Sequence, residues 1–446
     1  MRSARNLAII LMALATVRVA APGPLSVPRD EPGPNVILVV IDTLRARHLS
    51  CYGYQRQTTP FLDSIAEDSV LYEHAISTAP WTAPAMASLF TSFYPTAHGV
   101  TDHVEKYQTS MRAAVLSEQF TTLAEVLKDN GYQTVGITAN AWVADYLGFA
   151  QGFDSFVTRD QATAEQLNRE FFGLLHSLHL RRSKPSFLYV HYMDPHWPYD
   201  PRKGHGYDGV VEEYDYLPEH LESLNRYDAE IHYLDAQIRK LFEFLSSGGF
   251  CDNAIVVVAS DHGEQFGEYG NISHGHTVHN VEVHVPLLIK AVGLQPPARI
   301  DTTVSLVDVY PTLLELLEIP LEHPVQGISL ISDLDRRKRT SVLSEITRTG
   351  DFRAITNPDG MKLVREFTTD ETDLQRFGVD GWALYDSRTD YWELTPLPDK
   401  GALDLLASEF TSLQGESLLY RQGVNVLVTD LDEATVARLK ALGYSK

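Results

Sequence analysis

Cysteine is nearly absent from the sequence, because its 446 residues include only Cys51 and Cys251. Two thiols are too few for a structural zinc site built from cysteine alone, and they allow at most one disulfide. The sequence leaves open whether these two residues pair. The function therefore has to be sought in other residue types.

Positive charge is also scarce. The chain has 37 lysines and arginines against 59 aspartates and glutamates, which gives a formal net charge of -22 and an isoelectric point near 5.1. A protein that holds nucleic acid needs a basic surface, because contacts to the phosphate backbone dominate the affinity. Nucleic acid is therefore excluded as a partner. Any anion site has to be local, built from a metal ion and backbone donors.

The apolar run at the N-terminus is too short to cross a bilayer. Arg2 and Arg5 precede this run over residues 7–17, and small residues follow it. The pattern predicts a secretory signal peptide over residues 1–20 and a linker rich in proline and glycine over 21–34. We expect an exported protein, periplasmic or extracellular, with no membrane span after cleavage. An uncleaved anchor is the alternative.

Short apolar runs alternate with helical stretches from residue 35 onward. This pattern favours an α/β fold, in which helices flank a mainly parallel sheet. We expect buried strands over residues 36–41, 70–74, 134–138, 187–192 and 255–259, and helices over 61–67, 122–129 and 219–245.

The length and the 44% hydrophobic content are enough for a large core and a second domain. We predict a catalytic domain over residues 35–340 and a smaller C-terminal α+β subdomain over 341–446. Strands of the subdomain are expected near 341–346, 352–355, 362–364 and 383–386, and helices near 402–412 and 433–442.

Polar residues that can bind a metal follow several of the predicted strands. Asp42, the segment 191–196, and Asp261 with His262 all stand at carboxyl ends, where ligands gather in parallel sheets. Carboxylate oxygens and an imidazole suit a divalent cation. Read singly, Asp42 could instead cap a helix, and Asp261 and His262 could form a plain turn.

A second candidate feature is a helix that begins beside a hydroxyl. Thr82 is a good N-cap, Pro84 suits the first turn, and residues 85–90 are compatible with a helix. The open N–H groups at such an end attract an anion such as phosphate or sulfate. A divalent cation nearby would activate the Thr82 hydroxyl as a nucleophile. The alternative is that Thr82 is only a cap.

Five segments together carry a family resemblance. They cover residues 35–45, the helix at Thr82 with 94–100, and then 191–199, 260–264 and 306–317, in which the chain reads NVILVVIDTLR, YPTAHGV, HYMDPHWPY, SDHGE and LVDVYPTLLELL. With these motifs in this order, the chain resembles the sulfatase family of the alkaline phosphatase superfamily. The resemblance implies an alkaline phosphatase-like fold.

The resemblance also implies roles for particular residues. It makes Asp42, Asp261 and His262 metal ligands, and it makes Thr82 both the nucleophile and a ligand. It puts His196 among the catalytic residues, near the substrate anion and the leaving group. Calcium is the cation that the resemblance favours, while magnesium, manganese and zinc remain compatible with these ligands.

Three further positions follow from the same resemblance. Asn140 and His274 fall where the family has residues that bind the substrate anion, and His276 falls where it has a catalytic histidine. His279 and His284 complete a group of four histidines in this segment. We expect these last two to be structural or surface groups.

The chain departs from the family pattern at the nucleophile. Sulfatases that make formylglycine carry a cysteine or serine in a C/S-x-P-x-R motif, whereas residues 82–86 read TAPAM. Formylglycine is therefore not expected, and a covalent ester on Thr82 has to be cleaved by water or by a second acceptor. Thr43 also stands where the family often has a second aspartate.

Three functions remain after these departures. The first is a metal-dependent hydrolase of sulfuric or phosphoric esters of a small molecule, glycan or lipid, acting through Thr82. The second is a phosphotransferase that passes a phosphoryl-containing group to an alcohol. The third is an inactive binding protein that keeps the fold. The sequence predicts neither the particular ester nor the oligomeric state.

Overall fold

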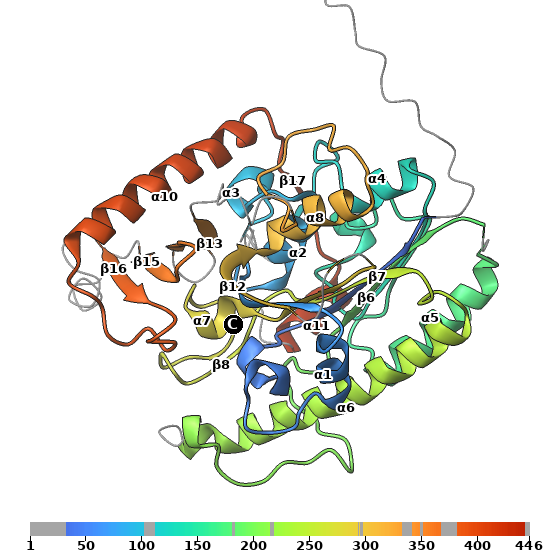
Figure 1. The fold of residues 1–446 in the computed structure, drawn as a ribbon, viewed down its shortest axis with the longest axis horizontal. Coiled ribbons are helices and arrows are strands. Elements are labelled where there is room, and N and C mark those ends of the chain that lie inside the picture. The colour runs from blue at the N-terminus through green and yellow to red at the C-terminus, as the bar shows by residue number, and fades with distance from the viewer. Residues whose placement is uncertain are drawn as a thin grey trace, which may run out of the picture.

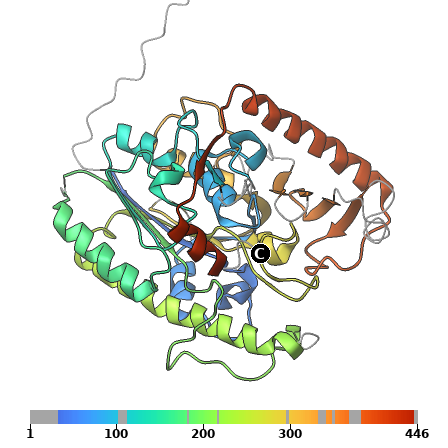
Figure 2. The same ribbon diagram turned by 180° about the vertical axis from the view of Figure 1, so that it is seen from behind.

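A nine-stranded sheet forms the centre of the described part of the chain. The computed structural model describes residues 33–101, 112–180, 183–214, 218–292, 294, 298–331, 341–347, 351–366 and 381–441. Helices α1, α5 and α6 cover one face of the sheet and α2, α4 and α8 cover the other (Figure 1; from behind in Figure 2). The predicted α/β fold, a sheet between helical layers, is confirmed.

The sheet order is β10-β2-β11-β7-β1-β6-β4-β5, with β12 beside β2. Strand β1 pairs in parallel with β6 and β7, and β4 pairs in parallel with β5 and β6, whereas β10 and β11 run antiparallel to their neighbours. The sheet is therefore mainly parallel, as predicted. Its strands are β1 Asn35–Ile41, β2 Val70–Ile76, β4 Gln133–Thr138, β5 Ser155–Thr158, β6 Ser186–Tyr192, β7 Ala254–Ser260, β10 His284–Val285, β11 Leu287–Lys290 and β12 Ala298–Ser305.

The helices include those predicted, with ends that differ by one or two residues except at α10, and also α3, α5, α7 and α8, for which no range was predicted. They are α1 Pro60–Ala66, α2 Thr82–Thr91, α3 Pro95–His98, α4 Leu123–Asp129, α5 Ala164–Leu178, α6 Leu221–Ser247, α7 Asn280–Val283, α8 Val309–Leu316, α10 Lys400–Arg421 and α11 Glu433–Ala441. Short 3-10 turns occur at η1 Ala46–His48, η2 Ser50–Tyr52, η3 Asp145–Leu147, η4 Glu212–Tyr214, η5 Pro218–His220 and η6 Leu306–Asp308.

The central strands bring their carboxyl ends to one edge. Strands β6 and β7 are buried along their whole length and β1 is buried after its first residue, as expected for apolar strands in the middle of a covered sheet. Ile41 lies opposite Tyr192 on one side and Ser260 on the other. The backbone N–H of Asp42 donates to the carbonyl of Tyr192 at 2.9 Å. Residues that follow these strands therefore emerge together.

A separate antiparallel sheet follows in the C-terminal part. Its order is β13-β14-β15-β16, with β13 Val342–Ile346, β14 Phe352–Thr356, β15 Met361–Glu366 and β16 Trp382–Asp386. Leu406 and Phe410 of α10 pack with Leu343 and Ile355 of this sheet. Helix α10 extends well beyond the expected 402–412. Two short pairs complete the strands: β3 Arg112–Val115 with β17 Leu427–Asp430, and β8 Gln265–Phe266 with β9 Ile272–Ser273.

Several predictions concern residues outside the described ranges. The signal peptide over 1–20, most of the linker over 21–34 and the domain boundary at 340 fall there. The division into domains over 35–340 and 341–446 therefore stays a prediction. Over the ranges that the structure describes, no helix has both the length and the apolar character to cross a membrane. Cys51 and Cys251 are both free thiols.

Candidate active site

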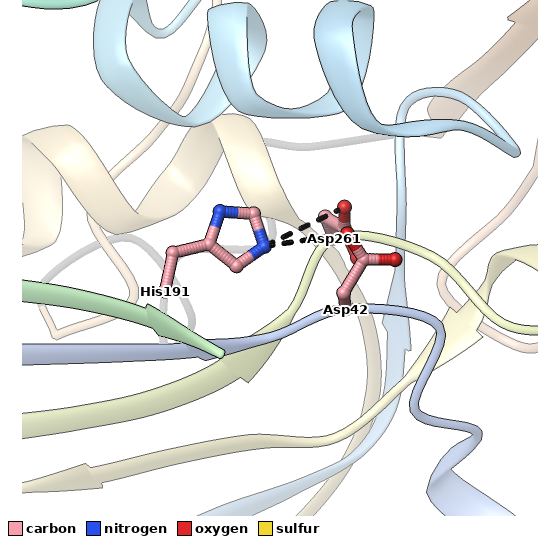
Figure 3. Close-up of side chains that lie close together, drawn as sticks. All are labelled: Asp42, His191 and Asp261. Carbon is pink, nitrogen blue, oxygen red and sulfur yellow. Dashed lines mark ion pairs between the residues drawn. The ribbon is translucent and has the colours of Figure 1, made fainter. Parts of the chain in front are cut away.

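Three strand ends bring two carboxylates and an imidazole together. Asp42 follows β1, His191 lies near the end of β6, and Asp261 follows β7. One donor atom from each of the three lies within 4.8 Å of the others, and all three side chains are buried (Figure 3). His191 Nε2 is 3.7 Å from Asp42 Oδ2 and 3.9 Å from Asp261 Oδ2. These distances are too long for hydrogen bonds.

Each of these three side chains has one buried polar atom without a hydrogen-bond partner among the described residues. These atoms are Asp42 Oδ1, His191 Nε2 and Asp261 Oδ2. A buried polar atom without a partner costs about 1–3 kcal/mol, so three in one place are unusual. Two carboxylate oxygens and an imidazole nitrogen around one point form a donor set that fits a divalent cation.

The electrostatics of the two carboxyl groups favour the same interpretation. Burial raises the pKa of Asp42 to about 8, and the neighbouring Asp261 carboxylate adds to the rise. Burial raises the pKa of Asp261 to about 7. Burial lowers the pKa of His191 to about 3, with His262 contributing, so its ring is neutral and able to ligate. A bound cation would offset the repulsion between the two carboxylates.

His262 presents a nitrogen lone pair to this cluster. Its Nδ1 lies 2.9 Å from the carbonyl oxygen of Gly263, which can only accept, so Nδ1 carries the proton. Nε2 then carries the lone pair, 3.3 Å from Thr82 Oγ1 and 3.5 Å from Asp261 Oδ2. A carbonyl that fixes the tautomer in this way is typical of histidines that bind metals.

Thr82 is the first residue of helix α2, and the prediction that it is the N-cap is wrong. Trp81 occupies the N-cap position and makes no capping hydrogen bond through its side chain. The Thr82 hydroxyl instead lies 3.4 Å from Asp42 Oδ2 and 3.1 Å from Asn140 Nδ2. Polar groups from three other segments, including His262, surround this hydroxyl, so the alternative of a mere cap fails as well.

Asn140 joins the nucleophile to the carboxylates. Its Nδ2 donates to Asp42 Oδ2 at 2.5 Å as well as to Thr82 Oγ1. Its Oδ1 accepts the backbone N–H of Trp142 at 2.7 Å, which fixes which way the amide points. Asn140 follows β4, the next strand beyond β6. The structure therefore places this predicted substrate-binding residue directly against the Thr82 hydroxyl.

His196 and His274 lie beside His262. The ring of His274 is 4.4 Å from the ring of His262 and 4.9 Å from that of His196, measured between centroids. His274 Nδ1 pairs with the buried carboxyl of Glu264 at 3.0 Å. The backbone N–H of His276 donates to Glu282 at 3.1 Å, a contact that does not bring its ring to Thr82. The catalytic role of His276 stays a prediction.

The motif after β1 turns its arginine away from the cluster. Arg45 is buried and its Nη1 pairs with Glu268 at 2.7 Å. Thr43, at the position where the family often has an aspartate, adopts a positive φ of 57°. Its backbone N–H donates to Asp261 Oδ1 at 3.2 Å, so Thr43 supports a carboxylate through its main chain.

The family model for sulfatases matches residues 34–319 of this chain, which include every residue of the cluster. The chain belongs to the sulfatase family. It is a sulfatase-family hydrolase, and the predicted membership is confirmed. One curated relative is arylsulfatase K of Mus musculus, 22% identical over 392 residues that cover 73% of this chain and 69% of the relative.

Solved structures show the same fold. One is a phosphonate monoester hydrolase of Agrobacterium radiobacter, with a TM-score of 0.66, 17% identity, and coverage of 86% of this chain and 96% of the other. Another is a protein in complex with its substrate D-glucosamine-2-N,6-O-disulfate, with a TM-score of 0.67, 17% identity, and coverage of 87% and 98%. Both confirm the predicted alkaline phosphatase-like architecture.

His191 is the residue of this site to which sequence reasoning gave no role. It stands in the segment 191–196, which the sequence places at a strand end. The signal that could have singled it out is the register of β6 against β1, which pairs His191 with Val40, two residues before Asp42. That register is a property of the folded sheet.

Proposed function

We propose that this sulfatase-family hydrolase cleaves sulfuric or phosphoric esters through Thr82 as the nucleophile, with a divalent cation. The observation that carries the proposal is the position of Thr82 Oγ1. It is fully buried at the mouth of α2, and Asp42, Asn140 and His262 all lie within 3.4 Å of it. A hydroxyl that serves only the stability of a helix has no need of such partners.

Asp42, Asp261 and His262 would hold the cation, with His191 at its side. When bound, such a cation lowers the pKa of a hydroxyl that it contacts and polarises the ester oxygen. Calcium is the cation that we expect from the family pattern. The deprotonated hydroxyl of Thr82 would complete the ligand set. Because Thr43 replaces a carboxylate of the family pattern, we infer that His191 supplies the fourth protein group.

In the first step, Thr82 Oγ1 attacks the sulfur or phosphorus atom and the bond to the alcohol leaving group breaks. The hydroxyl proton leaves along its contact to Asp42 Oδ2, because the lone pair on His262 Nε2 would be used to hold the cation. Asn140 Nδ2 and the open N–H groups of the first turn of α2 stabilise negative charge on the transferred group. The result is an ester on Thr82.

In the second step, water cleaves the Thr82 ester. His196 is the base that we assign to this water. Its Nδ1 lies 2.5 Å from the carbonyl oxygen of Trp197, so Nδ1 carries the proton and Nε2 carries the lone pair. Burial lowers the pKa of His196 to about 3, which keeps the ring neutral but makes it a weak base; we infer that the negative charge of the transferred group, once bound beside the ring, raises this pKa and lets Nε2 take the proton.

The comparisons support sulfate esters before phosphate esters. The curated relative quoted above is named as an arylsulfatase. Because a protein with a similar fold is named as a phosphonate monoester hydrolase, the assay described below also includes phosphorus esters. Export from the cell, predicted from the N-terminus, remains part of the proposal.

A parallel assay of the full chain tests the proposal. The substrates are 4-nitrophenyl sulfate, 4-nitrophenyl phosphate and bis-4-nitrophenyl phosphate, each with calcium, magnesium, manganese or zinc. Thr82→Val removes the hydroxyl at nearly constant volume and should lower kcat/KM by about 10⁴-fold to 10⁶-fold. Thr82→Ser should retain turnover, because it keeps the hydroxyl.

The outcomes separate the three functions. Equal rates for wild type and Thr82→Val would overturn the assignment of the nucleophile. A transferred product that appears only with an added alcohol would favour the phosphotransferase. Cation binding without turnover of any ester would favour the inactive binding protein.

A further inference from the structure

One buried carboxyl group gathers three backbone N–H groups beside the active site. Glu282 of α7 is fully buried. Its Oε2 accepts the backbone N–H groups of Gly275 at 2.7 Å, His276 at 3.1 Å and Thr277 at 3.5 Å. Its Oε1 accepts a hydrogen bond from Gln265 Nε2. Both oxygens of this carboxyl group therefore have their partners inside the protein.

The three N–H groups belong to a segment that has the form of an anion nest, a concavity lined by successive backbone N–H groups. The nest comprises residues 275–277, and Gly275 opens it with a left-handed φ of 77°. Such concavities bind anions such as phosphate in other proteins. Here the side chain of Glu282 occupies the concavity. The shape of the nest therefore depends on Glu282.

This contact differs from the usual one for a glutamate at its position in a helix. Glu282 is the third residue of α7, and His279 is the N-cap. A glutamate at the third position commonly accepts the N–H of the N-cap residue and so stabilises the start of the helix. Glu282 reaches instead to the nest, which precedes the N-cap. The stability of α7 alone does not explain this arrangement.

Helix α7 is in turn fixed to the turn that carries His262. The N–H of Gly263 donates to the carbonyl oxygen of Glu282 at 2.7 Å, and the N–H of Glu264 donates to that of Val281 at 3.1 Å. A Cβ atom on Gly263 would lie 2.2 Å from the carbonyl oxygen of Val281, so only glycine allows this close approach. The main chain of Glu282 thus holds the His262 turn, while its side chain holds the nest.

His274 directly precedes the nest. Its Nδ1 lies 3.0 Å from Glu264 Oε1, a contact that orients the ring. The centroid of this ring is 4.4 Å from that of His262. The backbone from which the ring extends is fixed at the next residue, Gly275, by Glu282. The position of His274 relative to His262 therefore depends on Glu282.

We propose that Glu282 is a positioning residue, which holds the imidazole of His274 beside the cation site, where it binds the transferred anionic group. The proposal rests on the proposed function and on the predicted role of His274 in binding the substrate anion. Glu282 itself touches no reacting atom. Because it acts through the nest and through His274, its loss should weaken the binding of an anion and spare the binding of the cation.

Two variants of Glu282 test the proposal on the full chain. Glu282→Met removes both acceptor oxygens at similar side-chain length. It should raise the Kd of inorganic sulfate, measured by calorimetry with calcium present, about 10-fold to 100-fold. The KM for 4-nitrophenyl sulfate should rise by the same factor, with kcat changed by less than about threefold, because uniform binding is lost. The Kd of calcium should stay at its wild-type value.

Glu282→Gln is the conservative variant. Its Oε1 still accepts the N–H groups of the nest, and the amide of Gln265 can turn to accept from the new NH₂ group. Sulfate affinity and KM should therefore return to nearly the wild-type values. A Glu282→Gln variant as weak as Glu282→Met would contradict the role of the acceptor oxygen.

A double variant and a matched control separate positioning from general damage. His274→Ala should weaken sulfate binding, and the addition of Glu282→Met should cause no further loss, because the two residues act as a unit. Asp235→Leu is the control. This buried carboxyl group accepts the backbone N–H groups of Phe61 at 2.9 Å and Leu62 at 2.8 Å, away from the nest. Asp235→Leu should lose stability but bind sulfate like wild type.

Amide hydrogen exchange measures the nest without an anion or turnover. The amides of residues 275–277 should exchange faster in Glu282→Met than in wild type, and slowly again in Glu282→Gln. Gly275→Ala strains the same nest, since alanine is disfavoured at a φ of 77°. It should weaken sulfate binding as well, and it carries the test if Glu282→Met does not fold.

The outcomes distinguish this proposal from the proposed function. Unchanged sulfate affinity in Glu282→Met overturns the role of Glu282, and so does a further loss in the double variant with His274→Ala. Equal turnover by wild type and Thr82→Val overturns the nucleophile alone. In that case sulfate binding and hydrogen exchange still decide whether Glu282 positions His274.

Discussion

The environment of Thr82 shows why a threonine suits this position. The side chain is fully buried, and its hydroxyl lies among Asp42, Asn140 and His262. A β-branched side chain has few rotamers, so the hydroxyl is held in one direction without a further hydrogen-bond partner behind it. The branching methyl group therefore limits the motion of the hydroxyl that we propose as the nucleophile.

His191 gives a prediction at the residue scale. His191→Gln should weaken binding of calcium or manganese about 10-fold to 100-fold, the scale for groups that support a metal site. Calorimetry on wild type and variant measures the change. His323→Gln is the control, because His323 contacts Tyr310 outside the cluster. Equal cation affinity in His191→Gln and His323→Gln would show that His191 does not bind the cation.

Residues at the site differ in how far the sequence predicts them. Asp42 and Asp261 follow apolar strands, so their place at the sheet edge follows from local pattern alone. The contact of Asn140 with Thr82 depends on the order of strands, and the family resemblance alone indicated it. His191 depends on the register between β6 and β1, which no local pattern encodes. Thr82 was expected to be the N-cap of its helix, but Trp81 occupies that position, so the helix begins one residue earlier than expected, at Thr82 itself.

At the scale of elements, local patterns gave both ends of α1, α4, α6 and α11 to within two residues, but they did not give the end of α10. Helix α4, expected over 122–129, begins at Leu123 behind a capping box, in which Thr122 Oγ1 accepts the backbone N–H of Glu125 and the Glu125 carboxylate accepts that of Thr122. Helix α10 runs on to Arg421, and its last turns pack beyond the small sheet: Tyr420 contacts Phe93, and Ser417 Oγ accepts a hydrogen bond from Gln326. Contacts with the rest of the fold therefore decide where α10 ends, which the local sequence pattern does not determine.

The capping box gives a prediction at this scale. Thr122→Ala should lower the free energy of unfolding by about 1 kcal/mol, because one backbone N–H at the start of α4 loses its acceptor. Urea denaturation followed by circular dichroism measures the change, and Thr122→Ser should restore most of it. Turnover at Thr82 should be unaffected, since α4 lies away from the cluster. A variant as stable as wild type would show that water replaces the cap.

At the scale of the whole molecule, a buried ion pair within the C-terminal part contacts the first part of the chain. Lys362 of β15 pairs with Glu393 at 2.9 Å, and both side chains are fully buried. Glu393 also contacts His279 Nδ1 at 2.6 Å. Burial alone would raise the pKa of Glu393, but Lys362 and His279 hold it below its ordinary value. His279, expected to be structural, lies in this network.

Removal of one partner of this pair should be costly. Lys362→Met leaves the Glu393 carboxylate buried without its cation, so we expect a loss of about 3–5 kcal/mol in the free energy of unfolding. The double variant Lys362→Met with Glu393→Gln removes both charges and should recover much of that loss. Chemical denaturation of all three proteins measures the difference. A double variant no more stable than the single one would contradict the explanation by charge.

The pairing of β17 with β3 affects how the chain can be made. Arg112 and Asp430, which lie opposite each other in this pair, are 318 positions apart in sequence. During synthesis, β3 leaves the ribosome long before β17 has been made. The backbone N–H and C=O groups that β3 will pair with β17 therefore stay unpaired until then. A premature stop codon shortly before position 427 would leave the Thr82 cluster intact in sequence. The truncated product would keep that open edge, so we expect it to aggregate or be degraded.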